Sequence, residues 1–164
     1  MPVDENKPLV VLDTNCYIEF LLGEASSSNR AAKVKSVLED NGKEIEIALP
    51  AIVRLELLSV GSKGENGRDG NVPKRRRDNY REVKRWLDSR ELLLIDISER
   101  LLRHTERVIY DHGLKVPDAL VLSSAEMFGA HKLYTFDSDL LHLNGRCEVA
   151  IEEPPEPNKL IFVD

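Results

Sequence analysis

Hydrophobic and polar positions divide the chain into short apolar runs and longer stretches with helical spacing. The short runs end at turn residues or at acids, which is typical of buried strands. The predicted strands are residues 9–13, 45–49, 92–97, 132–137 and 147–151. Because strands and helices alternate, we predict an α/β fold, a three-layer α/β/α sandwich around a central, mostly parallel sheet of four to five strands.

The longer stretches predict helices, with proline, serine or glycine near several of their ends. The expected helices are residues 17–22, 30–40, 50–60, 73–90, 98–112 and 117–128, and a short one at 140–142. Ser98 is a good N-cap, and Gly113 ends the same helix. Asn41 and Gly42 stand where a left-handed cap would close the helix 30–40.

The helix 73–90 combines an apolar stripe with many basic residues. Tyr80, Val83 and Leu87 recur at positions i, i+3 and i+7, so we expect them to face the core, with Trp86 at its edge. The segment carries a net charge of +5, whereas the whole chain carries −6. A basic ridge on an acidic protein predicts contact with a phosphate backbone, and the alternative is a solvated face of ion pairs. The candidate nucleic-acid-binding residues are Arg75, Arg76, Arg77, Arg81, Lys84 and Arg85.

Length and composition predict one globular domain over residues 1–164, with 41% hydrophobic residues to form its core. Glycine recurs in residues 61–72, which predicts a flexible insertion rather than a linker between domains. Residues 152–164 contain three prolines, at 154, 155 and 157, followed by the apolar patch 160–163. We expect this tail to dock in extended form or to offer an edge to a partner.

Several classes of protein are excluded by the sequence. No stretch approaches 18 apolar residues, so we predict no membrane-spanning helix. Acids stand where a signal peptide would have cations, so we predict a cytoplasmic protein that does not associate with a membrane. Cys16 and Cys147 are too few for a disulfide scaffold, and we expect both to be reduced. The histidines lack metal-ligand spacing, and no glycine-rich nucleotide loop is present.

Three carboxylates stand at the ends of predicted strands or at the start of a helix. Asp13 follows the apolar run 9–12, Asp137 ends the strand 132–137, and Asp118 begins the helix after Pro117. In a parallel sheet these positions share one edge, so the three acids are expected to meet there. Each has an alternative interpretation as a helix cap or as a partner of a helix dipole.

Glu56 lies in a helix that is apolar on nearly all sides. A buried carboxylate without a partner is costly, so this residue predicts a nearby cation. Arg54 lies on another face of the helix and cannot serve easily. The alternative is a salt bridge to a distant Lys or Arg. Together the acids predict either a site for a divalent metal ion or a strongly coupled proton site, because their mutual repulsion would otherwise be costly.

In their order and context, these motifs resemble the PIN-domain ribonuclease family. The motifs are Asp13-Thr14-Asn15 after a strand, Glu56 in an apolar helix, Pro117-Asp118-Ala119-Leu120, and Thr135-x-Asp137-x-Asp139-Leu140. The resemblance covers residues 9–149 and implies a PIN-like fold. It implies that Asp13, Glu56, Asp118 and Asp137 are the catalytic, metal-binding acids, that Asp139 is a more variable fifth acid, and that Thr14, Asn15 and Thr135 support the site.

The resemblance also implies an activity. It is that of a Mg²⁺- or Mn²⁺-dependent endoribonuclease that hydrolyses RNA phosphodiester bonds. Small members of the family are typically VapC-type toxins, so the resemblance implies an antitoxin protein as a partner, and a homodimer. Two alternatives remain at this point. One is a haloacid-dehalogenase-type phosphatase, which would require an acid at Asn15. The other is a catalytically silent module that binds RNA or protein.

Overall fold

The computed structural model describes residues 7–22, 29–63 and 72–157 of the chain. Five strands form its sheet, all parallel, in the order β3-β2-β1-β4-β5. The strands are β1 (Leu9–Leu12), β2 (Glu46–Pro50), β3 (Leu93–Ile95), β4 (Lys132–Tyr134) and β5 (Ala150–Glu152). The predicted α/β class and parallel sheet are confirmed, while the strands are shorter than predicted at several ends.

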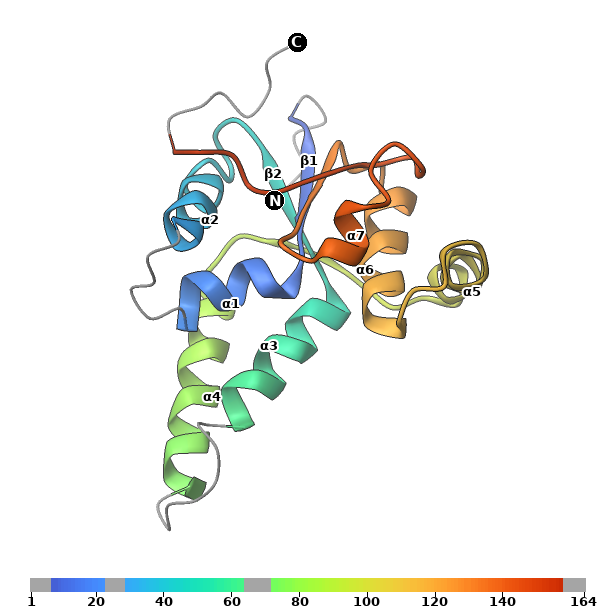
Figure 1. Cartoon of the computed structure of the whole chain (residues 1–164). Coiled ribbons are helices and arrows are strands. Elements are labelled where there is room, and N and C mark those ends of the chain that lie inside the picture. The colour runs from blue at the N-terminus through green and yellow to red at the C-terminus, as the bar shows by residue number, and fades with distance from the viewer. Residues whose placement is uncertain (1–6, 23–28, 64–71, 158–164) are drawn as a thin grey trace.

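Helices connect successive strands and cover both faces of the sheet (Figure 1). Before β3 come α1 (Thr14–Leu22), α2 (Arg30–Glu39), α3 (Ala51–Lys63) and α4 (Val72–Asp88). After β3 come α5 (Glu99–His112), α6 (Val116–Met127) and α7 (Ser138–Leu141). Helices α1 and α2 lie on one side of the sheet and α5 and α6 lie on the other, while α3 and α4 extend beyond its carboxyl end (Figure 1). This is the predicted three-layer sandwich.

The strand order reverses direction between β1 and β4. From β1 the chain moves outward through β2 to β3, and it then crosses back to β4 on the opposite side of β1. The switch point of the sheet therefore lies between the carboxyl ends of β1 and β4. In open parallel sheets such a switch point is the usual place for a ligand.

The core lies between the sheet and its two helical layers. Val10, Val11 and Leu12 of β1 are fully buried, as expected of a central strand covered on both faces. Cys16 is buried and Cys147 is half-buried, and both are free thiols. Within the described residues, no helix is long and apolar enough to cross a membrane.

Helix ends test the capping predictions. The Ser98 hydroxyl accepts a hydrogen bond from the Leu101 amide at 3.1 Å, and Gly113 ends α5 with φ +64°, so both predictions are confirmed. At α2 the prediction was only partly right. The cap is Asp40 in the right-handed region, and the left-handed residue is Gly42 (φ +76°).

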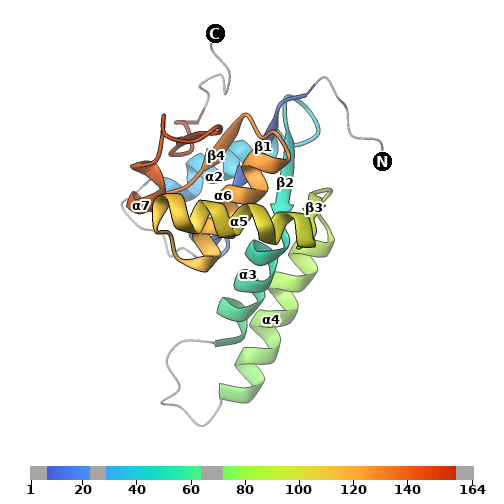
Figure 2. The same cartoon turned by 90° about the vertical axis from the view of Figure 1, so that its right-hand side faces the viewer.

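Helices α3 and α4 form an arm that projects from the body of the molecule (Figure 2). Val83 and Leu87 are buried, as predicted, but Tyr80 is 38% exposed. The prediction for Tyr80 was wrong because this part of α4 extends along the arm, where α3 is its main neighbour among the described helices. Trp86 lies against Tyr17 and Phe20, with ring centroids 6.1 and 5.7 Å apart, and this confirms it as a residue at the core edge.

The predicted insertion 61–72 begins later than expected, because α3 continues through Gly61 to Lys63. A Cβ atom at Gly61 would lie 3.1 Å from a methyl group of Val83, so glycine permits the close approach of α4. At the other end, the segment after β5 contacts α2, where Lys33 pairs with Glu156 at 2.9 Å. Residues 64–71 and the apolar patch 160–163 lie outside the described residues.

Candidate active site

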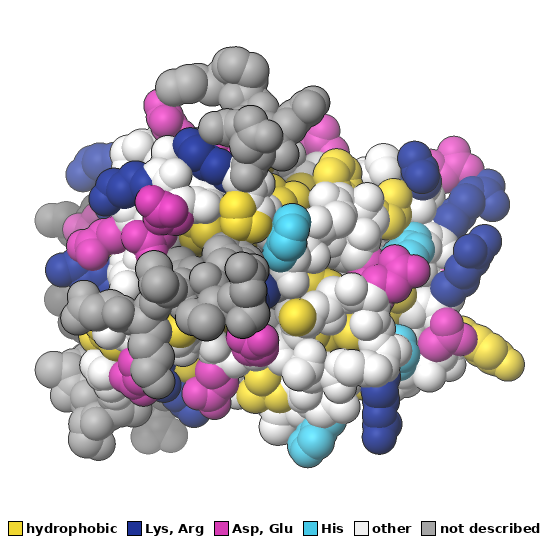
Figure 3. All heavy atoms as spheres, turned by 90° about the horizontal axis from the view of Figure 1, so that it is seen from above, with side chains coloured by type: hydrophobic (Ala, Val, Ile, Leu, Met, Phe, Trp, Pro, Cys, Tyr) yellow, Lys and Arg dark blue, Asp and Glu magenta, His cyan; other side chains and the backbone are white. Residues whose placement is uncertain are grey.

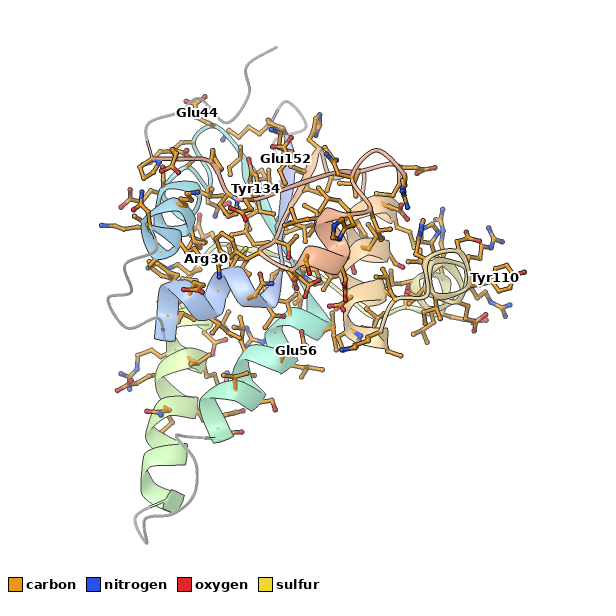
Figure 4. The ribbon with its side chains drawn as sticks, viewed as in Figure 1. Arg30, Glu44, Glu56, Tyr110, Tyr134 and Glu152 are labelled. Carbon is orange, nitrogen blue, oxygen red and sulfur yellow. The ribbon has the colours of Figure 1, made fainter. Side chains whose placement is uncertain are left out.

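Four segments meet at the carboxyl ends of β1 and β4. Asp13 follows β1, Glu56 lies in the second turn of α3, Asp118 lies in the first turn of α6, and Asp137 follows β4. Figure 4 shows Glu56 on α3 at the end of the sheet where α1 also begins. Hydrogen bonds through Thr14 and Thr135 link Asp13 to Glu56 and to the Asp137 backbone, and the charges of Glu56 and Asp137 raise the pKa of Asp118.

Asp13 is the most buried of these acids, with 5% of the residue exposed. Its Oδ1 accepts a hydrogen bond from the Thr14 amide at 2.7 Å, and its Oδ2 accepts one from the Thr135 hydroxyl at 2.9 Å. Burial raises the pKa of Asp13 to about 6, the two hydrogen bonds oppose that rise, and Asp118 and Glu56 add to it. Asp13 therefore gains from any cation that offsets its charge.

Thr135 connects β4 to β1 through a fully buried hydroxyl. Besides donating to Asp13, this hydroxyl accepts hydrogen bonds from Nδ2 of Asn15 at 3.3 Å and from the Asp137 amide at 2.9 Å. The Asn15 Oδ1 in turn accepts from the Phe136 amide at 3.2 Å. Thr135 and Asn15 thus fix the loop after β4 against the end of β1.

Glu56 differs from its prediction in two respects. Its helix is not buried all round, since Leu55 is 57% exposed, and Glu56 itself is half-buried. It also has a partner other than a cation, because Thr14 donates a hydrogen bond from its hydroxyl to Oε2 of Glu56 at 2.5 Å. Arg54 points elsewhere, as predicted, and pairs with Asp88 at 2.6 Å.

Asp118 lies in the first turn of α6, one residue after Pro117. The residue is half-buried, and its pKa is raised by burial and by the charges of Asp137 and Glu56. Lys115 partly offsets this rise. Lys115 was missed in the sequence, although its position three residues before Asp118, at the cap of the same helix, could have indicated it.

Asp137 combines two of the roles weighed from the sequence. Its Oδ1 accepts hydrogen bonds from the amides of Asp139 and Leu140 at 2.8 and 3.2 Å, so it is the N-cap of α7. At the same time its charge raises the pKa of Asp118, so it also belongs to the acidic region. Asp139 is exposed and has a smaller effect on the same pKa.

The donor chemistry of these acids suits a hard divalent cation, because all of it is carboxylate oxygen. Within the described residues, no three acidic, histidine or cysteine side chains form a group that could by itself enclose a metal ion. Mg²⁺ does not require such a group, since it usually keeps several waters and uses one or two carboxylates directly. The acids therefore fit an ion that is held partly through water.

The predicted basic residues lie apart from the acids, on α4. Arg81, Lys84 and Arg85 are exposed, and Lys84 pairs with Asp88 at 2.5 Å, so part of this face has the ion pairs of the alternative interpretation. Arg75, Arg76 and Arg77 lie in the first half of α4, but their side chains are outside the described part of the structure.

A second cation that the sequence did not indicate lies beside the loop after β4. The guanidinium of Arg30, at the start of α2, is 4.7 Å from the centroid of the Phe136 ring and pairs with Glu19 at 3.4 Å. Phe136 separates Thr135 from Asp137, so this contact supports the loop that carries Asp137. The sequence carried no signal for this contact, because only the tertiary fold brings the start of α2 next to Phe136.

Comparison with known proteins gives a family and a set of similar structures. The model of the PIN domain family matches residues 10–145. A search of curated proteins gives no match. Solved structures of the same fold include a toxin–antitoxin complex from Klebsiella pneumoniae, with a TM-score of 0.62 at 20% identity, covering 90% of this chain and 98% of the other.

Two further structures give the same result. VapBC2 from Rickettsia felis, bound to a DNA fragment from its promoter, has a TM-score of 0.63 at 20% identity and covers 88% of this chain and 98% of that one. DNA-bound VapBC from Salmonella typhimurium has a TM-score of 0.61 at 19% identity, with 89% and 98% covered. At these identities the comparison establishes the fold.

Proposed function

Because this chain belongs to the PIN domain family, we propose that it is a Mg²⁺- or Mn²⁺-dependent endoribonuclease that hydrolyses RNA phosphodiester bonds. The observation that carries the proposal is the group of four acids at the switch point between β1 and β4. Burial and mutual repulsion raise the pKa of Asp13 and of Asp118. Clustered carboxylates without a cation lower the stability of the folded protein, because they are desolvated and repel one another. A bound divalent cation would offset this repulsion and could activate a water for hydrolysis.

The proposed roles follow from the surroundings of each acid. Asp13, Asp118 and Asp137 would hold the ion directly or through water, and Glu56 would be a further ligand or would orient the attacking water. When bound, the ion supplies a Lewis acid that activates water and offsets charge on the leaving oxygen. Thr14 orients Glu56, while Thr135 and Asn15 orient Asp13 and the loop of Asp137.

The test is cleavage of an RNA pool by purified protein with Mg²⁺ or Mn²⁺ and with EDTA. We expect cleavage only with metal, and none from Asp13→Asn. Asp96→Asn is the matched control, because Asp96 is exposed and lies outside the site. Undiminished cleavage by Asp13→Asn, or absence of cleavage of any RNA by the wild type, would overturn the proposal.

We further propose that the nuclease is the toxin of a toxin–antitoxin pair. The support is that one similar structure is described as a toxin–antitoxin complex and two others as VapBC bound to DNA. Expression should arrest growth, co-expression of the adjacent open reading frame should relieve the arrest, and its product should co-purify with this chain. A homodimer, cytoplasmic location and RNA contact by the α4 arginines are proposed with it. Growth that is unaffected by the wild-type chain would contradict the toxin role without affecting the nuclease chemistry.

A further inference from the structure

A hollow of about 310 Å³ lies against α5, and three of its five lining residues are arginines. Its lining residues are Arg100, Arg103, His104, Arg107 and Met127. The four α5 residues are spaced i, i+3, i+4 and i+7, so they project from one side of the helix. Met127, the last residue of α6, completes the lining. None of these residues belongs to the acidic site.

The charges in this hollow are only partly compensated. Arg103 pairs with Glu99 at 2.6 Å, and Nε2 of His104 lies 2.8 Å from a carboxylate oxygen of Glu126, whose side chain is almost buried. Arg100 and Arg107 have no hydrogen bond or ion pair with any described residue. The hollow therefore holds two guanidinium groups that are available to an anionic ligand.

An exposed aromatic residue extends the same side of α5. Tyr110 follows Arg107 by three positions, is 89% exposed, and points away from the body of the molecule (Figure 4). Figure 3 shows Lys and Arg side chains gathered at this end of the molecule, over α5. Beyond Tyr110 the chain continues through residues 113–115 into α6 and to Asp118, so α5 ends close in sequence to the acidic site.

We propose that Arg100 and Arg107 bind the phosphate backbone of single-stranded RNA in this hollow, and that Tyr110 stacks on one of its bases. The proposal rests on the proposed nuclease function and deepens it by naming a binding surface apart from the acids. Guanidinium groups match phosphate geometry, and aromatic side chains with cations form the usual surface for single strands. Because the chain carries a net charge of −6, RNA binding must rely on such local groups.

The test measures binding in EDTA, where no cleavage occurs. A fluorescently labelled oligoribonucleotide of about 16 nucleotides is titrated with protein at about 50 and about 200 mM salt. The variant is Arg100→Gln/Arg107→Gln. The matched control is Lys43→Gln/Arg146→Gln, which removes the same charge from two exposed residues outside the hollow. Circular dichroism melting confirms that all the proteins are folded.

Two lost phosphate contacts should lower the slope of log affinity against log salt by about 1.4. The gain in affinity between the two salt concentrations should then be about sevenfold smaller in the double variant than in the wild type. Arg107→Gln alone should give about half of the slope change. Tyr110→Ser should weaken binding by at least about fivefold, while Tyr110→Phe, which keeps the ring, should bind like the wild type.

Three results would overturn the proposal: an unchanged slope in the double variant, an equal loss in the control, or a change in oligomeric mass by sedimentation with RNA binding unaffected. The last would assign the surface to contact between protein chains. Since binding is measured in EDTA, a wild type that binds through Arg100 and Arg107 but cleaves no RNA would refute only the nuclease proposal. Metal-dependent cleavage by the wild type, together with an unchanged salt slope in the double variant, would refute only the proposal that RNA binds in the hollow.

Discussion

The hydroxyl of Thr135 donates a hydrogen bond of 2.9 Å to Oδ2 of Asp13 and thereby joins the ends of β4 and β1. The two residues are far apart in the sequence, yet parallel pairing of these strands places them side by side. The same hydroxyl accepts hydrogen bonds from Asn15 and from the Asp137 amide. One buried side chain therefore uses its single proton and both lone pairs to orient the site.

We predict that Thr135→Val lowers the free energy of unfolding by about 1–3 kcal/mol, because it leaves buried polar partners without a hydrogen bond. The loss of this bond should also raise the pKa of Asp13 further, since the bond holds it down. Urea denaturation of the variant beside Thr135→Ser, which keeps the hydroxyl, provides the measurement. Equal stability of the two variants would contradict the role assigned to the hydroxyl.

The raised pKa of Asp13 predicts a pH-dependent stability in metal-free protein. The folded-state pKa of about 6 lies above the unfolded value near 4, so the folded state retains a proton that the unfolded state has lost. Ionisation of Asp13 should therefore lower the free energy of unfolding as pH rises from about 4 to about 6, by up to about 3 kcal/mol. This cost should persist at neutral pH until a divalent cation is added.

The measurement is chemical denaturation in EDTA between these pH values, for wild type and for Asp13→Asn. The difference in unfolding free energy between the two proteins should grow in favour of the variant as pH rises, because the amide does not ionise. Asp96→Asn should follow the wild type. A constant difference between wild type and Asp13→Asn would show that the pKa of Asp13 is not raised.

Asp137 offers a way to separate structure from catalysis. Asn is as good an N-cap as Asp, so Asp137→Asn should keep α7 while removing the charge, and Asp137→Ala should lose both. We expect both variants to lose metal-dependent RNA cleavage, and only Asp137→Ala to lose about 1 kcal/mol of stability. Thermal unfolding and cleavage assays test this in parallel. Full activity in Asp137→Asn would restrict Asp137 to capping.

The positions of Asp13, Asp118 and Asp137 could be predicted because local signals fix them. Each stands at the end of an apolar strand or at the start of a helix after proline, and a parallel sheet brings such positions to one edge. The strand order itself, and with it the switch point between β1 and β4, depends on contacts between distant segments. The fold, but not that order, could be predicted from the sequence.

The surroundings of Glu56 were predicted less well, for a physical reason. The composition of residues 51–60 indicates an apolar helix but does not say which parts other elements cover. Leu55 is exposed because α3 leads into the arm, and the hydrogen bond from Thr14 to Glu56 crosses between α1 and α3. The same limit applies to Tyr80, whose helical spacing suggested a buried face. Helical periodicity identifies the apolar face of a helix, but it does not show whether another element packs against that face.

The hydrogen bond between Thr14 and Glu56 leads to the last prediction. Glu56→Gln can still accept the hydrogen bond from Thr14, but it removes a charge that raises the pKa of Asp13 and of Asp118. The metal-free variant should therefore be more stable than the wild type at neutral pH and should gain less stability from added Mg²⁺, because less repulsion remains for the ion to offset. Its cleavage rate should fall on the order of 10²–10⁴-fold if Glu56 orients the attacking water.

Melting temperatures with EDTA and with Mg²⁺, together with single-turnover cleavage rates, measure these effects. Glu44→Gln is the matched control, since Glu44 is exposed in the turn before β2 and lies far from Glu56 (Figure 4). An Mg²⁺-dependent rise in melting temperature as large in Glu56→Gln as in the wild type would show that Glu56 takes no part in holding the ion. Thr14→Ala should reduce cleavage less than Glu56→Gln, because it frees the carboxylate without removing its charge.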